Sequence, residues 1–245
     1  MNKYNKIITF LIVIIISGCS TYDAQYKDDN YTPSIIDSKD DSNTKDKEIE
    51  TSIYLIGDAG DAELGESTDG LSSFKNYIKN QQTKNDYVLF LGDNIYDKGL
   101  PSKKDEDYNL SKHRLDVQLK SVKDFDGKTI FIPGNHDWYS DGLRQEEYIE
   151  KKLKDKNAFQ PENGCPIKKI TISDDILLVI IDTQWYLEDW DKHPTMNDEC
   201  EIKTRHDFLV EVKSLFAKSN EKTLLVAMHH PTYTNGYHGG NFNFK

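Results

Sequence analysis

The sequence is short of cysteine, of basic residues and of long apolar segments, and each shortage excludes a class of protein. Three cysteines in 245 residues are too few for a disulfide scaffold. The 31 basic residues face 42 acidic ones, and the sequence has no stretch of clustered Lys and Arg that a nucleic-acid-binding surface needs. The apolar run over residues 7–16 is too short to span a bilayer comfortably. With 36% hydrophobic and 11% aromatic residues, the chain can nevertheless bury a sizeable core.

The N-terminus has the features of an export signal. A basic start is followed by the apolar run 7–16 and by small residues before Cys19. The ending Ile16-Ser17-Gly18-Cys19 resembles the lipobox of bacterial lipoproteins, in which the cysteine becomes the lipidated first residue. This resemblance implies a signal peptide over residues 1–18 and a membrane anchor at Cys19. We therefore expect a lipoprotein of the bacterial cell envelope that faces the periplasm or the exterior; the alternative is an ordinary cleaved signal with an incidental cysteine.

Residues 20–50 differ in composition from the rest of the chain. They hold nine acidic and four basic residues, scattered polar side chains and few apolar clusters. Such a composition is typical of an extended, disordered spacer. We predict that residues 19–50 are the lipidated cysteine and its tether, and that the folded domain covers residues 51–245.

After residue 51, short apolar runs alternate with helical patterns. Runs rich in Ile, Val, Leu and aromatic residues, typical of buried strands, cover 52–56, 87–91, 129–132, 176–181 and 223–228. Apolar residues at helical spacing lie between them: Leu71, Phe74, Tyr77 and Ile78; Leu115, Leu119 and Val122; and Phe208, Leu209, Val212, Leu215 and Phe216, the last group after a cap at Thr204. Strands alternating with helices predict a layered α/β fold. Residues 168–173 lead directly into the strand 176–181 and predict a hairpin, so part of the sheet structure is expected to be antiparallel.

Most of the buried strands run directly into residues that can bind a metal ion. The four segments are Gly57-Asp58-Ala59-Gly60, Gly92-Asp93-Asn94-Ile95-Tyr96, Gly134-Asn135-His136-Asp137 and His229-His230-Pro231. In an α/β sheet the ligand site lies beyond the carboxyl ends of the strands, so these segments are expected to converge. Each segment alone is compatible with a turn or with an ordinary histidine. Their occurrence together indicates a metal site.

The order of these segments resembles the calcineurin-like metallophosphoesterase superfamily. Its motifs run Asp-x-His or Asp-x-Gly, Gly-Asp, Gly-Asn-His-Asp/Glu, a later His at a strand end, and Gly-His-x-His. The chain has the first four in order. Gly60 stands where many members have histidine, and Tyr96 follows Asp93 by three positions, so the sequence looks like a small purple acid phosphatase. The resemblance implies the metallophosphoesterase fold, with mixed sheets flanked by helices.

The resemblance also implies a dinuclear metal centre that hydrolyses phosphate monoesters through a metal-activated hydroxide. Asp93 would bridge the two ions, Asp58 and Tyr96 would bind the first, and Asn135 and His229 the second. A phenolate ligand favours a trivalent ion, so we expect Fe(III) paired with Fe(II), Zn(II) or Mn(II). The ions would give the site a positive charge and let an acidic protein bind a phosphate ester.

The remaining polar residues of these motifs are expected to act around the metals. His136 and His238 resemble the family's histidines that stabilise the transition state, protonate the leaving group or face the substrate. Asp137 would orient His136 or cap the segment that follows. His230 is expected to be a wall of the substrate pocket.

The last motif of the superfamily, Gly-His-x-His, is absent, although it would supply one histidine to each metal. We therefore expect the sequence to be part of a longer protein, with the C-terminal portion of its fold missing. Two further functions stay open: a phosphodiesterase or nucleotidase with the same centre, and a catalytically inactive lipoprotein that serves as a binding module.

Two features outside the motifs leave alternatives. Cys165 and Cys200 form one disulfide or stay as two free thiols. Segments 139–160 and 183–200 correspond to the loops that set specificity in the superfamily. Trp185, Tyr186 and Trp190 line a pocket there or, as is commoner for such aromatics, pack on the core.

Overall fold

A computed structural model describes residues 49–193, 195–218 and 222–232. All of these except Thr232 belong to one structural unit, Glu48–Pro231. The signal peptide, Cys19, nearly all of the tether and His238 lie outside the described residues. Within the described part, no helix has the length and apolarity needed to cross a membrane.

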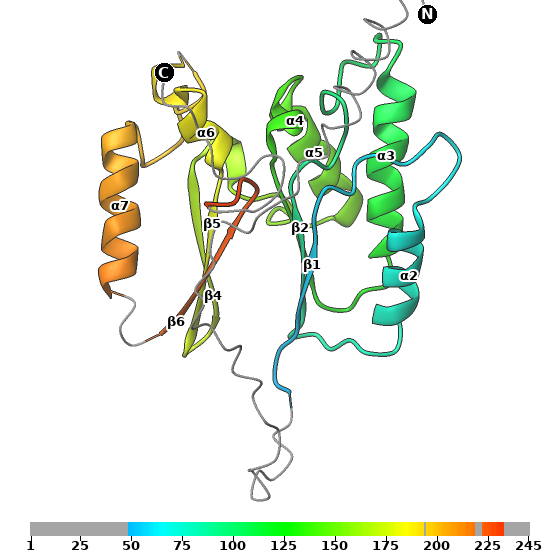
Figure 1. Cartoon of the computed structure of the whole chain (residues 1–245), viewed down its shortest axis with the longest axis horizontal. Helices are drawn as coiled ribbons and strands as arrows, with labels where there is room; N and C mark the ends of the chain where they lie inside the picture. The colour runs from blue at the N-terminus through cyan, green and yellow to red at the C-terminus, as the bar shows by residue number, and fades with distance from the viewer. Residues whose placement is uncertain (1–48, 194, 219–221, 233–245) are drawn as a thin grey trace, which may run out of the picture. The chain divides into compact units, whose positions relative to one another are not determined.

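Within the described residues, six strands form two separate sheets (Figure 1). In the first, β1 (Ile53–Ile56), β2 (Tyr87–Leu91) and β3 (Lys128–Ile132) lie side by side and are all parallel. In the second, β4 (Ile167–Ser173) pairs antiparallel with β5 (Ile176–Ile181), and β6 (Thr223–Met228) pairs parallel with β5. The expected strands, hairpin and α/β layering are therefore confirmed.

Helices flank the two sheets (Figure 1). Their bounds are α2 (Asp69–Ile78), α3 (Tyr108–Ser121), α4 (Asn135–Trp138), α5 (Gly142–Leu153), α6 (Thr183–Leu187) and α7 (Arg205–Lys218), with short 3₁₀ turns at η1 (Glu162–Gly164) and η2 (Trp190–Lys192). The hydroxyl of Thr204 accepts a hydrogen bond from the backbone N–H of Asp207, so the predicted cap of α7 is present.

The side-chain alternation of the strands builds three apolar layers. Leu89 of β2, Ile130 of β3 and Leu178 of β5 meet in the layer between the two sheets. Their neighbours along the strands point the other way, because successive side chains of a strand lie on opposite faces. Phe90 and Phe131 thus belong to the layer beneath the helices of the first sheet. The order of layers is helices, sheet, sheet, helices.

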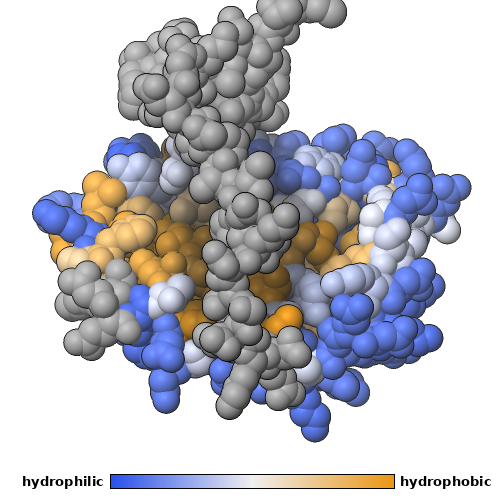
Figure 2. All heavy atoms as spheres, turned by 60° about the horizontal axis from the view of Figure 1, so that its bottom comes forward, coloured by the Kyte–Doolittle hydropathy of each residue, from blue (hydrophilic) through white to orange (hydrophobic). Residues whose placement is uncertain are grey.

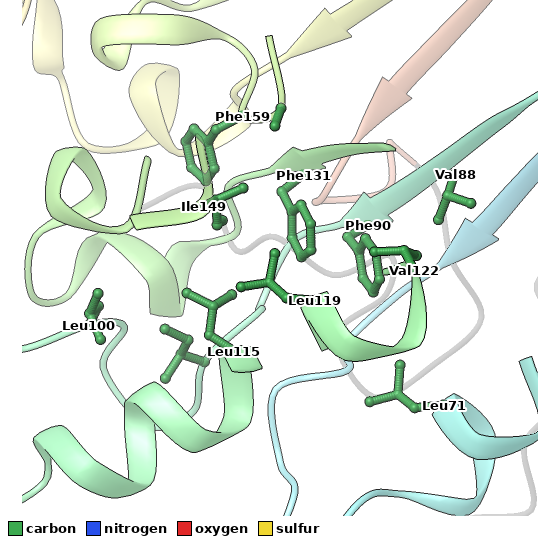
Figure 3. Close-up of a cluster of buried hydrophobic side chains, with 12 residues drawn as sticks. Leu71, Val88, Phe90, Leu100, Leu115, Leu119, Val122, Phe131, Ile149 and Phe159 are labelled. Atoms are coloured by element: carbon green, nitrogen blue, oxygen red, sulfur yellow. The ribbon is translucent and has the colours of Figure 1, made fainter. Parts of the chain in front are cut away.

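The layer between the first sheet and its helices is the larger of the two outer cores (Figure 3). Phe90 and Phe131 stack with ring centroids 4.1 Å apart, and Leu115 and Leu119 of α3 pack against the same cluster. On the other side, Trp185 of α6 is fully buried and stacks on Phe208 of α7. Trp185 therefore packs on the core.

Apolar side chains also reach the surface. Figure 2 shows them across the middle of one face, between hydrophilic margins. β1 is an end strand of its sheet, and Leu55 on it exposes 62% of its surface. Leu209 and Phe216 of α7, which follow the helical pattern, are likewise more than half exposed, so that pattern overstates the buried face of α7.

The structure decides one open alternative and changes the description of one predicted loop. Cys165 and Cys200 form a disulfide, which joins the segment before β4 to the segment before α7. Segment 139–160, expected as a specificity loop, contains the twelve-residue helix α5. Its cap is Asp141, whose carboxylate accepts a hydrogen bond from the N–H of Arg144, and its residue Ile149 is fully buried. Most of this segment is thus part of the folded core.

Candidate metal centre

Four parallel strand ends supply the predicted ligands. β1, β2, β3 and β6 end one to three residues before Asp58, Asp93, Asn135 and His229 respectively. Asp58, Asp93 and His229 offer ligand atoms that all lie within 4.8 Å of one another. Three segments that are far apart in the sequence therefore converge at one place, as predicted, although they come from two sheets and not from one.

The turn after β2 is the centre of this arrangement. Gly92 has φ +94°, and a Cβ at this position would lie 2.6 Å from Nδ1 of His229, so only glycine allows the histidine to approach. Asp93, the next residue, is buried and also has a positive φ of 50°; Asp58 has φ 52°. Left-handed backbone at non-glycine residues costs on the order of 1–3 kcal/mol and is typical of binding sites.

Both oxygens of Asp93 face histidines. Oδ1 lies 3.3 Å from Nε2 of His229 and accepts a hydrogen bond of 3.1 Å from the backbone N–H of His136. Oδ2 lies 3.9 Å from Nε2 of His136. A Cβ on Gly134 would lie 2.2 Å from Oδ1, so the backbone of the loop after β3 packs closely against this carboxylate. Asp93 is therefore contacted from the ends of β3 and β6 at once.

The orientation of each histidine is fixed by its other ring nitrogen. Nδ1 of His229 donates to the carbonyl oxygen of Leu91 at 2.9 Å, and Nδ1 of His136 donates to the carbonyl of Asp97. A carbonyl oxygen only accepts, so both Nδ1 atoms carry hydrogen. Nε2 of each ring is left to face Asp93, and such a backbone hydrogen bond is the usual support of a metal-binding histidine.

Tyr96 and Asn135 lie beside this group. The phenol of Tyr96 donates to Oδ1 of Asp58 at 2.8 Å, so these two predicted ligands of the first metal are in contact. The ring of Tyr96 also meets that of His136 edge-on, with centroids 4.6 Å apart. The amide nitrogen of Asn135 donates to the hydroxyl of Tyr139, which leaves the amide oxygen as the ligand atom.

The charges at the site are strongly coupled. Burial raises the pKa of the Asp93 carboxyl, but the hydrogen bond and charge of His229 outweigh burial and bring it below its usual value. Burial lowers the pKa of His229, and Asp93 outweighs it in turn, raising that pKa to about 9. Burial and the hydrogen bond to Asp58 raise the pKa of Tyr96. These carboxylates favour a positive charge among them, whether a proton or a metal ion.

The donor set fits a metal centre. Two carboxylates, a phenol, an amide oxygen and an imidazole Nε2 are the ligand types of Fe, Mn and Zn sites. The carboxylates and Nε2 lie close enough to share an ion, and the histidine is held in the tautomer that leaves Nε2 available. The residues present therefore fit the implied metals.

Asp137 lies inside α4 and holds the start of that helix, not the segment that follows it. It is fully buried and accepts hydrogen bonds from the backbone N–H groups of Gly134, Asn94 and Ile95, and from the side chain of Gln145. Burial raises its pKa to about 6, although these donors oppose the shift. The expectation that Asp137 caps the following segment is wrong, because α5 is capped by Asp141. The Asp137 carboxylate instead joins the loops after β2 and β3, while the carbonyl of Asp97 orients His136.

His230 lies next to His229 but has a different environment. Its Nδ1 is 2.6 Å from the hydroxyl of Thr183, and its backbone N–H donates to the same hydroxyl. Burial and the neighbouring charge of His229 lower its pKa. Its contacts place it beside the candidate ligand His229, and its role in the wall of the substrate pocket stays a prediction.

The sequence reading missed the end of β5. Asp182 directly follows the buried strand β5, just as the predicted ligands follow other buried strands. Its position at a strand end is therefore a signal by which the sequence could have identified it. Asp182 is fully buried and accepts a hydrogen bond of 3.0 Å from the indole N–H of Trp138 in α4. With Thr183 beside His230, the end of β5 thus holds α4 and the end of β6 in place.

The site is defined by the strand ends. A cavity of about 580 Å³ lies beside the disulfide, and Cys165, Cys200, Glu199 and Glu201 are among its lining residues. None of the predicted ligands lines it. A search guided by cavity size alone would therefore miss the candidate metal centre.

Two facing sheets, with carboxylates, a phenol and histidines gathered beyond their strand ends, define a metal-binding α/β protein. The chain belongs to the calcineurin-like phosphoesterase family, whose sequence profile matches residues 51–245. No curated protein matches the chain. Members of this family use a dinuclear metal centre to hydrolyse phosphate esters, and Asp58, Asp93 and His229 form a candidate metal-binding group in this chain.

Proposed function

We propose that the chain hydrolyses phosphate monoesters with two metal ions held beyond the ends of β1, β2, β3 and β6. The observation that carries the proposal is the position of Asp93. This buried carboxylate lies within ligand distance of Asp58 and His229, and its two oxygens face two different histidines. A carboxylate whose two oxygens face different neighbours is suited to give one oxygen to each of two cations.

The ligands divide into two groups around that bridge. Asp58 and Tyr96, in contact with each other, would hold the first ion; Asn135 and His229 would hold the second. When bound, the two ions would supply Lewis-acid polarisation of the ester and an activated water as nucleophile. The chain's own groups fix where the ions and the phosphate sit.

His136 is the residue placed to act on the substrate. Its Nδ1 is fixed by the carbonyl of Asp97, its Nε2 faces Asp93, and its ring contacts those of Tyr96 and Tyr139. When protonated, Nε2 can donate to a phosphoryl oxygen or to the leaving alkoxide. His238 has the same expected role and stays a prediction.

The finer class is proposed from Tyr96. A phenol in contact with a carboxylate ligand supports the purple acid phosphatase type, with Fe(III) in the first site and Fe(II), Zn(II) or Mn(II) in the second. A visible charge-transfer absorption that disappears in Tyr96→Phe would support this class. An active enzyme without this absorption would refute the purple acid phosphatase subtype and would not affect the proposed hydrolase activity.

Membrane anchoring through Cys19 is a separate proposal. It rests on the apolar run and the Ile16-Ser17-Gly18-Cys19 ending, and the Cys165–Cys200 disulfide fits a chain exported to an oxidising compartment. Labelling with a radioactive fatty acid in a bacterial host should modify the wild type and not Cys19→Ser. Equal labelling of both would contradict the anchor.

The activity is tested with Asp93→Asn against a matched control. The control, Asp116→Asn, changes a half-buried aspartate of α3 that contacts Tyr148 and Lys112, away from the ligands. Hydrolysis of an aryl phosphate monoester should be lost in Asp93→Asn and kept in Asp116→Asn. Measuring an aryl phosphodiester in parallel separates a monoesterase from a diesterase, and full activity of Asp93→Asn would refute the proposed function.

A further inference from the structure

Arg114 of α3 is a buried cation in contact with two of the ligand-bearing loops. Its side chain is 10% exposed, so its N–H groups need partners within the protein. Nε donates to the carbonyl of Ala62 at 3.0 Å, and Nη1 donates to the carbonyl of Tyr96 at 2.7 Å. Nη2 pairs with the carboxylate of Asp61 at 2.9 Å.

These contacts join the loop after β1 to the loop after β2. Ala62 lies four residues after Asp58, and the other carbonyl belongs to Tyr96 itself. The same loops meet again where the N–H of Tyr96 donates to the carbonyl of Gly60 at 3.0 Å. A Cβ on Gly60 would lie 2.5 Å from the backbone of Asn94, so the two loops have no room to slide past each other.

The guanidinium group is suited to this task. Its donors point in fixed directions in one plane, so one side chain can hold two carbonyls from different loops at a set separation. A lysine ammonium presents its donors from one point and cannot reproduce both contacts. The ion pair with Asp61 adds little to stability, since Asp61 is 74% exposed, but it fixes the direction in which Nη2 points and so helps to orient the guanidinium group.

We propose that Arg114 is a positioning residue of the metal centre, which sets the separation of Asp58 and Tyr96 by holding the two loops that carry them. The inference rests on the proposed function, because Asp58 and Tyr96 are taken as ligands of the first ion. Arg114 does not touch the substrate or the ions. Its effect is confined to the first metal site, while Asn135 and His229 of the second are supported by other contacts.

The test is metal binding by Arg114→Lys in the purified chain, measured by calorimetry with Mn²⁺ alone. The matched control, Arg144→Lys, changes an arginine of α5 that likewise binds a carbonyl, that of Leu100, and an aspartate, Asp141. Loss of a group that orients a metal ligand typically costs 10–100-fold in affinity. We expect about tenfold weaker binding at one site in Arg114→Lys, an unchanged second site, and wild-type binding in Arg144→Lys.

A second pair of variants keeps the test decisive if Arg114→Lys does not fold. Asp61→Asn removes the carboxylate that holds Nη2, and Glu63→Gln removes an exposed charge two residues away in the same loop. Mn²⁺ binding at one site should be several-fold weaker in Asp61→Asn than in Glu63→Gln.

The outcomes separate this inference from the proposed function. Wild-type protein that binds no Mn²⁺ contradicts the proposed metal centre. Wild-type protein that binds two ions, with equal affinities in both pairs of variants, refutes the role of Arg114 and leaves the metal centre intact. Equal weakening of both sites in Arg114→Lys would show a general structural effect and would also refute it.

Discussion

The buried carboxyl group of Glu146 predicts how the stability of the protein changes with pH, and by how much. It lies on α5, is 7% exposed, and both of its oxygens accept from the backbone N–H of Asn163, at 3.0 and 3.1 Å. Burial raises its pKa from 4.5 to about 7, with Glu150 and Glu162 adding to the shift and the Asn163 N–H opposing it. The folded protein therefore holds a proton that the unfolded chain releases at lower pH.

The sign of the pH dependence follows from this shift. Below pH 4.5 both states are protonated and Glu146 contributes nothing to stability. Between pH 4.5 and 7 the unfolded chain binds fewer protons, so the free energy of unfolding falls as the pH rises. Above pH 7 the full penalty is about 3 kcal/mol, at roughly 1.4 kcal/mol per unit of pKa.

Glu146→Gln removes this titration and keeps an oxygen that can accept from Asn163. Relative to wild type, its free energy of unfolding in urea should rise progressively between pH 4.5 and 7, by about 2–3 kcal/mol in total. The control is Glu147→Gln, at the exposed neighbouring position, where the difference should stay within about 0.5 kcal/mol. A difference between Glu146→Gln and wild type that does not change with pH would refute the reasoning.

Three further predictions concern stability. Phe131→Ala should lower the free energy of unfolding by about 3–5 kcal/mol, because Phe131 is fully buried and stacks on Phe90; a loss below about 1 kcal/mol in urea unfolding would contradict this. Replacing Cys165 and Cys200 together by serine should cost about 2–4 kcal/mol, since the bridge closes a loop of 35 residues, and reduced wild type should match the variant. Trp138→Phe should lower the free energy of unfolding by about 1–3 kcal/mol, because Asp182 loses the hydrogen bond from the indole N–H. Burial already raises the pKa of Asp182 to about 7, and the loss of this donor should raise it further. Calorimetric unfolding at several pH values checks both effects.

The strands could be predicted from the sequence because buried parallel strands read as continuous apolar runs. β2, β5 and β6 have the predicted bounds, and β1 and β3 differ by one residue. The proximity of Asp58 and Asp93 also follows from the sequence, since β1 and β2 are parallel and end at the same edge of one sheet. These features depend on local patterns and on one general rule of topology. His229 follows β6 of the second sheet and joins them only because the two sheets pack against each other.

Other features could not be predicted because they depend on contacts between distant segments. The sequence predicts a loop where α5 lies, since the pattern is dominated by charged residues and only tertiary packing buries Ile149. Arg114 lies 52 residues from the carbonyl of Ala62 that it holds, and nothing in its neighbourhood in the sequence marks it. The hydrogen bonds of Asp137 with Asn94 and Ile95 likewise become visible only when the loop after β2 is placed beside α4.

The most direct test of the metal centre is a crystal of the chain grown with Mn²⁺ and measured at the manganese absorption edge. We expect two anomalous peaks on either side of the Asp93 carboxylate, one beside Asp58 and Tyr96 and the other beside Asn135 and His229. In Asp93→Asn crystals both peaks should weaken or vanish. Peaks elsewhere only, or peaks unchanged by Asp93→Asn, would contradict the account.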